Sequence, residues 1–373
     1  MTEKIITYHI GGRSGSIGFP KIDQFKDETK HIIFDADESC IQQIKDQWDN
    51  ADVYPYFIGN KNEEIKFNIN YCPYTSSVYN FNNSYKDHFI EIGETDYVFG
   101  KVCETQKNIN IKTDTLDNLH NKKLIPPANF LSIDTQGSEF EVLKGAENLI
   151  KNSILAINSE ISFVNVYKDS TLFNEIDSFM KKNHFMMVDI LGFNTGYKRI
   201  AKEFRGRGIP LQGEAMYFKD PKYIIRNNLN SSDLLLIKLS YIALAFGYTE
   251  FAYDTLLKVN NPENIKTKYS AFLNKFKIQI EQNKNLPKLW HNEVSFEESN
   301  NRFLKNSRIN KKILSTSIIL KIINKFFYFT KKLLKNLFIE INFNSPLSKF
   351  EKFLKKNNFD IAAQEIRKRR KSL

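Results

Sequence analysis

Cysteine, long apolar runs and metal-ligand motifs are scarce in this 373-residue chain. The three cysteines, Cys40, Cys72 and Cys103, are widely spaced and form no Cys-x-x-Cys pair, so neither a disulfide framework nor a zinc site is indicated. No spacing of His, Asp and Glu suggests a catalytic metal. No run approaches the ~18 uninterrupted apolar residues of a transmembrane helix, and the start lacks the apolar stretch of a secretory signal. We therefore expect a protein of the reducing cytoplasm.

The net charge of +11 is unevenly distributed. Residues 301–373 carry 19 Lys and Arg against 4 Asp and Glu, a balance of +15, and the preceding 300 residues sum to −4. The basicity therefore belongs to the tail, and charge does not indicate a nucleic-acid surface elsewhere. No Asn/Asp-Pro-Pro-Tyr/Phe motif, which cradles a flipped base, follows any expected strand. Nucleic acid is not an expected partner.

Strand-like and helix-like segments alternate as far as Pro221, and the strand pattern then stops. Alternation of this kind favours an α/β fold with a mostly parallel, doubly wound sheet and helices on both faces. Two further helices are expected within Ser232–Val259. Strands are expected at about 4–10, 31–34, 53–58, 65–69, 108–113, 130–134, 154–161, 185–190 and 215–219. The predicted domains are a sheet domain (1–221), a small helical appendage with a linker (222–300) and a basic amphipathic helical tail (301–373).

The tail repeats Lys pairs between apolar stretches over residues 305–371, as in Ile318–Phe327. Basic amphipathic segments suit an anionic bilayer surface, where each Lys or Arg contributes about 1 kcal/mol. We expect a peripheral location at the inner membrane face. Packing of the tail on its own protein or on a partner, and binding to nucleic acid, are the alternatives.

The most informative segment begins at the strand expected to end in Asp134. A tight turn through Gly137 follows, and then a helix with Phe140, Leu143 and Ala146 on one side. In open α/β sheets ligands bind at the carboxyl ends of the strands, which places Asp134 where chemistry occurs. Capping of the following helix is the structural alternative for this carboxylate. The segment from 131 to 146 has the sequence LSIDTQGSEFEVLKGA.

A glycine-rich turn directly follows the first expected strand. Gly11 and Gly15 let the backbone approach a ligand closely, and Gly12 adds conformational freedom. Asp35 ends the second strand 24 positions after Gly11, close to the spacing at which a carboxylate takes ribose hydroxyls. Asp37 is the rival for the same role.

The segment around Asp134 closely resembles the FkbM-type methyltransferases, whose pattern runs roughly Ile-Asp-Val-(Gln/Glu)-Gly-(Ala/Ser)-Glu. Ile111–Leu119 looks like the family's Thr-Leu-Asp-x-Leu segment, Asn158–Ile161 resembles its next strand, and Phe173–Ile190 resembles the following helix and strand. The resemblance covers about residues 5–220. It implies a Rossmann-like fold, S-adenosylmethionine as cofactor, and methylation of a hydroxyl oxygen, often on a sugar or glycan-linked acceptor.

The resemblance also implies roles for particular residues. Asp134 and Glu160 would face the crevice from neighbouring strand ends, where one orients the acceptor hydroxyl or accepts its proton. Asp134 is also expected to contact the cofactor, together with Gly11, Gly12, Gly15 and Asp35. Ser76 and Ser77 resemble the family's Ser-containing loop near the cofactor, although a solvated loop is the alternative for them.

The donor loop departs from the family pattern at two positions. His9 and Arg13 stand where the family has Asp and Asn. A cation at Arg13 near a positively charged donor is unfavourable unless it points away or pairs with a carboxylate. For His9 we expect a strand-end histidine satisfied by the backbone rather than a catalytic residue. The alternative function is therefore a non-catalytic binding or scaffold protein that keeps the methyltransferase fold, with the basic tail as its functional end.

Overall fold

The computed structural model describes residues 4–11, 28–36, 41–48, 51–92, 95–198, 208–227 and 232–260. The chain divides into two compact units, Met1–Leu286 and Pro287–Leu373, and all described residues lie in the first. Gly12, Gly15, Arg13, Asp37 and the basic tail lie outside the described residues. The domain limits predicted from the sequence stay a prediction.

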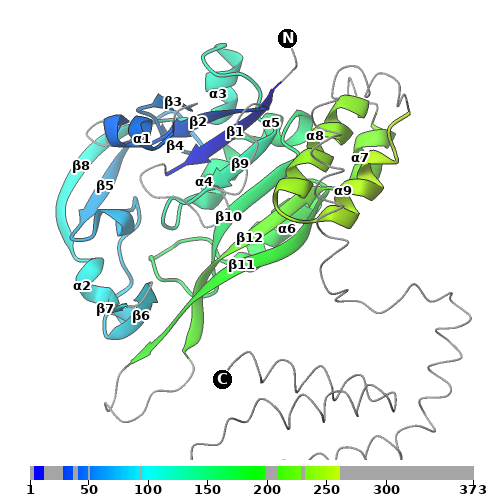
Figure 1. Ribbon diagram of the computed structural model, residues 1–373. Coiled ribbons are helices and arrows are strands. Elements are labelled where there is room, and N and C mark those ends of the chain that lie inside the picture. The colour runs from blue at the N-terminus through cyan, green and yellow to red at the C-terminus, as the bar shows by residue number, and fades with distance from the viewer. Residues whose placement is uncertain are drawn as a thin grey trace, which may run out of the picture. The chain divides into compact units, whose positions relative to one another are not determined.

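A large mixed sheet forms the centre of the described part of the chain (Figure 1). Its strand order is β3-β2-β1-β9-β10-β12-β11-β6-β7. Pairing is parallel from β3 to β10 and antiparallel from β10 to β7. The strands are β1 Ile5–Ile10, β2 Thr29–Phe34, β3 Ala51–Tyr54, β6 His88–Ile92, β7 Thr95–Val98, β9 Phe130–Ile133, β10 Ala156–Ser162, β11 Phe185–Lys198 and β12 Ile209–Lys219.

The parallel half contains the point at which the strand order reverses. From β1 the chain adds β2 and β3 on one side, and it later returns to place β9 and β10 on the other. Ligands bind outside the carboxyl ends of the strands at such a switch point. The carboxyl ends of β1 and β9 therefore mark the expected site.

Helices cover both faces of the sheet (Figure 1). Buried side chains of α3, α4, α5 and α6 pack with Tyr8 and Ile10 of β1 on one face. Side chains of α1, α7, α8 and α9 pack with Ile5 of the same strand on the other. Alternate residues of a strand point to opposite faces, so one apolar strand supports both layers. The helices are α1 Ile41–Gln47, α3 Leu116–Asn121, α4 Glu139–Lys144, α5 Glu147–Asn152, α6 Phe173–Lys182, α7 Pro221–Arg226, α8 Ser232–Ala245 and α9 Thr249–Leu256.

The doubly wound, Rossmann-like class predicted from the sequence is confirmed, with three corrections. We expected a mostly parallel sheet, but its antiparallel part is as large as its parallel part. The reason is that β6 and β7 extend the antiparallel part, within a region expected to be mixed or loop. The strand expected at 53–58 is interrupted at Pro55 and divides into β3 and β4. The helix expected after Gly137 is two short helices, α4 and α5, separated by Gly145 and Ala146.

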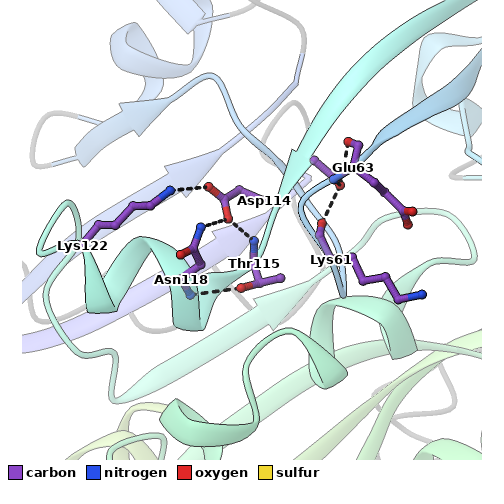
Figure 2. A network of polar contacts seen from close by, with 7 residues as sticks. Lys61, Glu63, Asp114, Thr115, Asn118 and Lys122 are labelled. Carbon is purple, nitrogen blue, oxygen red and sulfur yellow. Dashed lines mark hydrogen bonds and ion pairs between the residues drawn. The ribbon is translucent and has the colours of Figure 1, made fainter.

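A small second sheet leads into the Thr-Leu-Asp segment, which begins α3. It has the order β4-β8-β5, with bounds Phe57–Ile58, Thr105–Asp114 and Glu64–Asn70. Figure 2 shows the network where β8 passes into α3: Thr115 caps α3 by accepting from the Asn118 backbone N–H at 3.0 Å, and Asp114 accepts from the Asn118 side-chain amide at 2.6 Å. Such a cap satisfies a backbone donor that the helix itself leaves unpaired.

Asp117 serves a different helix. Its carboxylate accepts from the backbone N–H groups of Asn148 (2.8 Å) and Leu149 (3.0 Å), in the first turn of α5. Ala146 at the start of α5 provides no side-chain cap. Asp117 therefore caps α5 from outside, and its negative charge also complements the helix dipole.

Candidate active site

The carboxyl ends of β1 and β9 lie directly against each other. The Asp134 N–H donates to the Ile10 carbonyl at 3.0 Å, and the Gly11 N–H donates to the Phe34 carbonyl of β2 at 3.0 Å. Gly11 has a φ of +87°, and a Cβ on it would lie 1.9 Å from the Asp134 carbonyl oxygen. Only glycine fits here, so the close approach of β1 to β9 depends on this residue.

The turn after β9 is held in an unusual conformation. Gln136 has a φ of +57° and Gly137 a φ of +107°. A non-glycine residue in the left-handed region costs about 1–2 kcal/mol. The buried carboxylate of Glu139 offsets this cost, because it accepts from the Thr135 N–H (2.9 Å), the Thr135 hydroxyl (3.0 Å) and the Gly137 N–H (3.0 Å).

The side chain of Gln136 joins the two predicted catalytic carboxylates. Its Nε2 donates to Asp134 Oδ1 at 2.8 Å and lies 3.3 Å from each carboxylate oxygen of Glu160. Gln212 of β12 donates to Glu160 Oε1 at 3.0 Å. Two neutral amides, rather than Lys or Arg side chains, thus provide the hydrogen bonds to this pair of carboxylates within the described part of the chain.

Gln136 is anchored from the opposite side by the loop before β6, which contains Ser77, and by the segment between β10 and α6, which contains Tyr167. The Ser77 hydroxyl donates to the Gln136 carbonyl oxygen at 2.7 Å. The Tyr167 hydroxyl lies within donating distance of Gln136 Oε1 (3.0 Å) and of the Thr75 carbonyl oxygen (2.8 Å). With Oε1 facing Tyr167, Nε2 must face the carboxylates.

Burial sets the protonation of these carboxylates. It raises the pKa of Asp134 from its ordinary 3.8 to about 7, with smaller contributions from the charges of Glu139 and Glu214, whereas the Gln136 amide acts in the opposite direction. Burial, followed by the charges of Asp134, Glu139 and Glu214, raises the pKa of Glu160 well above its usual range. At neutral pH the Asp134–Glu160 pair therefore holds at least one proton, and it titrates as a unit.

Glu214 adds a further carboxylate to the same face of the sheet. It pairs with Glu160 across the β10–β12 ladder and accepts from the Asn158 side-chain amide at 2.8 Å. Ile133 pairs with Ser159, so the chain places Asp134 level with Glu160. Three neighbouring strands, β9, β10 and β12, thus bring the carboxyl groups of Asp134, Glu160 and Glu214 to one edge of the sheet.

The structure brings most of the described candidate residues to this edge. Gly11, Asp134 and Glu160 lie together, and Asp35 follows β2 beside Gly11, with its N–H donating to the Tyr54 carbonyl at 3.2 Å.

Ser77 reaches Gln136 directly. Ser76 does not, because its hydroxyl accepts from the Asn70 N–H at 3.1 Å. Asp134 accepts from the Gln136 side chain, and the Gly137 N–H ahead of α4 donates to Glu139. The carboxylate that pairs with the backbone N–H groups of Thr135 and Gly137 ahead of α4 is therefore that of Glu139, whereas Asp134 pairs with a side chain.

His9 lies inside the sheet rather than at the edge. Its side chain is 1% exposed, and burial, together with His31, lowers its pKa to about 4. His9 is therefore neutral at physiological pH and brings no positive charge to the donor loop. The argument about a cation near the donor concerns Arg13, which lies outside the described residues.

Several residues of the site were missed from the sequence. Gln136 and Glu139 lay within the motif, but nothing in the residue order shows that a left-handed turn aims one at the carboxylates and anchors the other. Tyr167, Gln212 and Glu214 reach the site through long-range pairing that only the folded sheet reveals.

The edge fits a cationic organic ligand. Buried carboxylates with raised pKa values are stabilised in their ionised form by a nearby positive charge. The close backbone at Gly11 and the carboxylate of Asp35 suit the remainder of a nucleoside-bearing donor. Among the described residues, no group of three or more His, Cys, Asp or Glu side chains is arranged to hold a metal ion, and no helix is long and apolar enough to cross a membrane.

Part of the chain matches the model of a known family. The model of the methyltransferase FkbM domain matches residues 10–187. Two solved structures are similar: a methyltransferase FkbM from Methylobacillus flagellatus KT (12% identity, TM-score 0.33, 58% of this chain and 43% of that one) and a precorrin-6y C5,15-methyltransferase from Geobacter metallireducens GS-15 (8% identity, TM-score 0.29, 59% and 82%). The match thus spans less than half of the first of these chains. A comparison with curated proteins gave no match.

Proposed function

We propose, from the match of residues 10–187 to the methyltransferase FkbM domain, that the chain transfers a methyl group from S-adenosylmethionine to a hydroxyl of a carbohydrate or glycan-linked acceptor. The cofactor supplies an electrophilic methyl group on a positively charged sulfur. The observation that carries the proposal is the carboxylate pair, Asp134 and Glu160, bridged by Gln136 at the topological switch point.

The chain's own residues divide the work between binding and proton transfer. Gly11 lets the backbone approach the donor, and Asp35 offers a carboxylate to ribose hydroxyls. The Asp134–Glu160 pair provides a negative counter-charge. In its ionised state the same pair accepts the proton that the acceptor hydroxyl loses as its oxygen attacks. Holding donor and acceptor in line supplies most of the acceleration in such a displacement.

The choice of a sugar acceptor is supported by the segment that anchors Gln136. Tyr71 and Tyr74 are 71% and 51% exposed next to Thr75, which is fixed by Tyr167. Exposed aromatic rings with polar tips suit sugar rings, which present apolar faces and hydroxyl edges. A carboxylate base supports a hydroxyl oxygen as the methylated atom, because a hydroxyl loses its proton as its oxygen attacks.

A methyl-transfer assay tests the proposal. The full chain is incubated with S-adenosylmethionine and a set of sugars, and both S-adenosylhomocysteine and methylated product are measured by mass spectrometry. We expect product with an O-linked methyl group. Asp134→Asn should abolish turnover, whereas Asp46→Asn on the exposed face of α1 should not. Turnover that survives Asp134→Asn, or a methyl group on nitrogen or carbon, would contradict the assignment.

The basic tail leads to a separate proposal about location. Residues 305–371 are proposed to hold the protein at an anionic inner membrane surface, which the charge of +15 over residues 301–373 supports. Sedimentation with phosphatidylserine vesicles tests this. Binding that is lost in high salt or on neutral vesicles is expected, and equal binding to neutral vesicles would count against it.

A further inference from the structure

Within the described residues, no Lys, Arg or His side chain forms an ion pair with Asp134 or Glu160, the central pair of the site. The carboxylates of Asp134 and Glu160 accept hydrogen bonds from the side-chain amides of Gln136 and Gln212. A buried carboxylate in this situation keeps a proton until a cation arrives.

Gln136 is the residue that couples the two carboxylates. Its amide has two hydrogens, one directed at Asp134 Oδ1 and one lying between the two oxygens of Glu160. Hydrogen bonds of this kind favour the ionised form of an acid, and the amide acts in that direction on both groups. The left-handed backbone of Gln136 and the Tyr167 hydroxyl leave the amide in one orientation.

We propose that Gln136 is a positioning residue that keeps Asp134 and Glu160 as one proton-sharing pair, and that the pair gives up a proton to solvent when the cationic donor binds. This inference rests on the proposed function. The ionised pair then takes the proton of the acceptor hydroxyl as the new C–O bond forms and the S–CH₃ bond breaks. The product S-adenosylhomocysteine is neutral, so the reprotonated pair matches it. Binding of the donor thus creates the base that the reaction uses.

The charged groups around the pair determine the pH at which this occurs. The charges of Glu139 at the start of α4 and Glu214 on β12 raise the pKa of Glu160, whereas the Gln136 amide lowers it. Gln212 donates a further hydrogen bond to Glu160. Between S-adenosylmethionine and S-adenosylhomocysteine the amino-acid, ribose and adenine groups are the same. The difference in protons released therefore isolates the effect of the sulfonium charge.

Calorimetric titration of the full chain tests the proposal. Binding enthalpies of both ligands are measured near pH 7 in phosphate, HEPES and Tris, whose ionisation enthalpies differ. We expect about one more proton to be released with S-adenosylmethionine than with S-adenosylhomocysteine. As the pH is raised towards the pKa of the pair, donor affinity should rise by up to about tenfold per pH unit, and above that pKa it should level off. Product affinity should not change in this way.

Variants separate a positioning role from a purely structural one. Gln136→Met keeps the length of the side chain and removes the amide, so the preference for S-adenosylmethionine over S-adenosylhomocysteine should fall about tenfold. The matched control is Gln42→Met in α1, where an exposed glutamine makes the same amide–carboxylate contact with Asp46 at 2.9 Å. This variant should leave both affinities unchanged.

The outcomes are distinguishable. Equal proton release for the two ligands in the wild-type chain would refute the inference and leave the methyltransferase proposal intact, and this comparison needs no variant to fold. An equal loss of affinity for both ligands in Gln136→Met would reduce Gln136 to a structural residue. No binding of either ligand would overturn the methyltransferase proposal and this inference with it.

Discussion

Replacing Asp134 by Asn should stabilise the ligand-free protein while destroying its activity. The reason is the raised pKa of the carboxyl group: in the unfolded chain it ionises near 3.8, but in the fold only near 7. The folded state therefore binds more protons than the unfolded state between these pH values, and stability from this group falls as pH rises through that window.

The magnitude follows from the shift. A change in pKa from 3.8 to about 7 corresponds to roughly 4 kcal/mol above pH 7, at about 1.4 kcal/mol for each tenfold change in proton affinity. At about pH 5 only a part of this cost, about 1–2 kcal/mol, has developed. Asn removes the cost at every pH, so its stabilising effect should be about 3 kcal/mol larger at pH 8 than at pH 5.

Urea unfolding followed by far-UV circular dichroism measures this difference. Wild type and Asp134→Asn are compared at both pH values, with Asp46→Asn as the control, because Asp46 accepts a similar glutamine bond at an exposed position. The control should change the free energy of unfolding by less than about 0.5 kcal/mol at either pH. A stabilisation by Asp134→Asn that does not grow with pH, or a loss of stability at pH 8, would refute the reasoning.

Three further outcomes are expected. Gly11→Ala places a Cβ 1.9 Å from the Asp134 carbonyl oxygen at a φ of +87°, so thermal unfolding should show a clear loss of stability and calorimetry a loss of donor binding; unchanged binding would mean that β1 and β9 can separate without harm. Asp117→Ala removes the cap of α5 and should cost about 1–2 kcal/mol in urea unfolding without changing the donor Kd; an altered Kd would contradict a purely structural role. Asp35→Ala should weaken donor binding about tenfold or more while leaving the unfolding midpoint unchanged, and equal affinity would remove Asp35 from the site.

The parallel half of the fold could be predicted from the sequence because its strands are short apolar runs bounded by polar turns. β1, β2, β9 and β10 all lie close to their expected positions. The antiparallel half was less accessible, because β6 lies near a stretch rich in Asn, Ser and Tyr and pairs with β11 across about a hundred residues. Pairing at that distance depends on tertiary context, which local patterns do not carry.

Site residues that directly follow a strand could be predicted from the sequence. Residues whose side chains reach the site because of an unusual backbone conformation or a long-range contact could not. Asp134 and Asp35 follow directly from strand ends. Gln136 required knowledge of a left-handed backbone at a non-glycine position, which sequence gives no reason to expect. The motif's Thr-Leu-Asp segment was assigned only by resemblance, and the structure gives it a mechanical role in capping α3 and α5.

The external cap on α5 limits how this protein can be cut or rearranged. Asp117 stands 32 positions before Leu149, the residue whose N–H it accepts, so a fragment that begins after α3 would contain the whole of α5 and yet lack the group that completes its first turn. A helix of six residues is too short to persist in water by itself. Any trimmed or circularly permuted version that is meant to keep β9 and the turn after it must therefore place its new terminus before Asp117, and shuffled chimaeras should exchange α3 and α5 together.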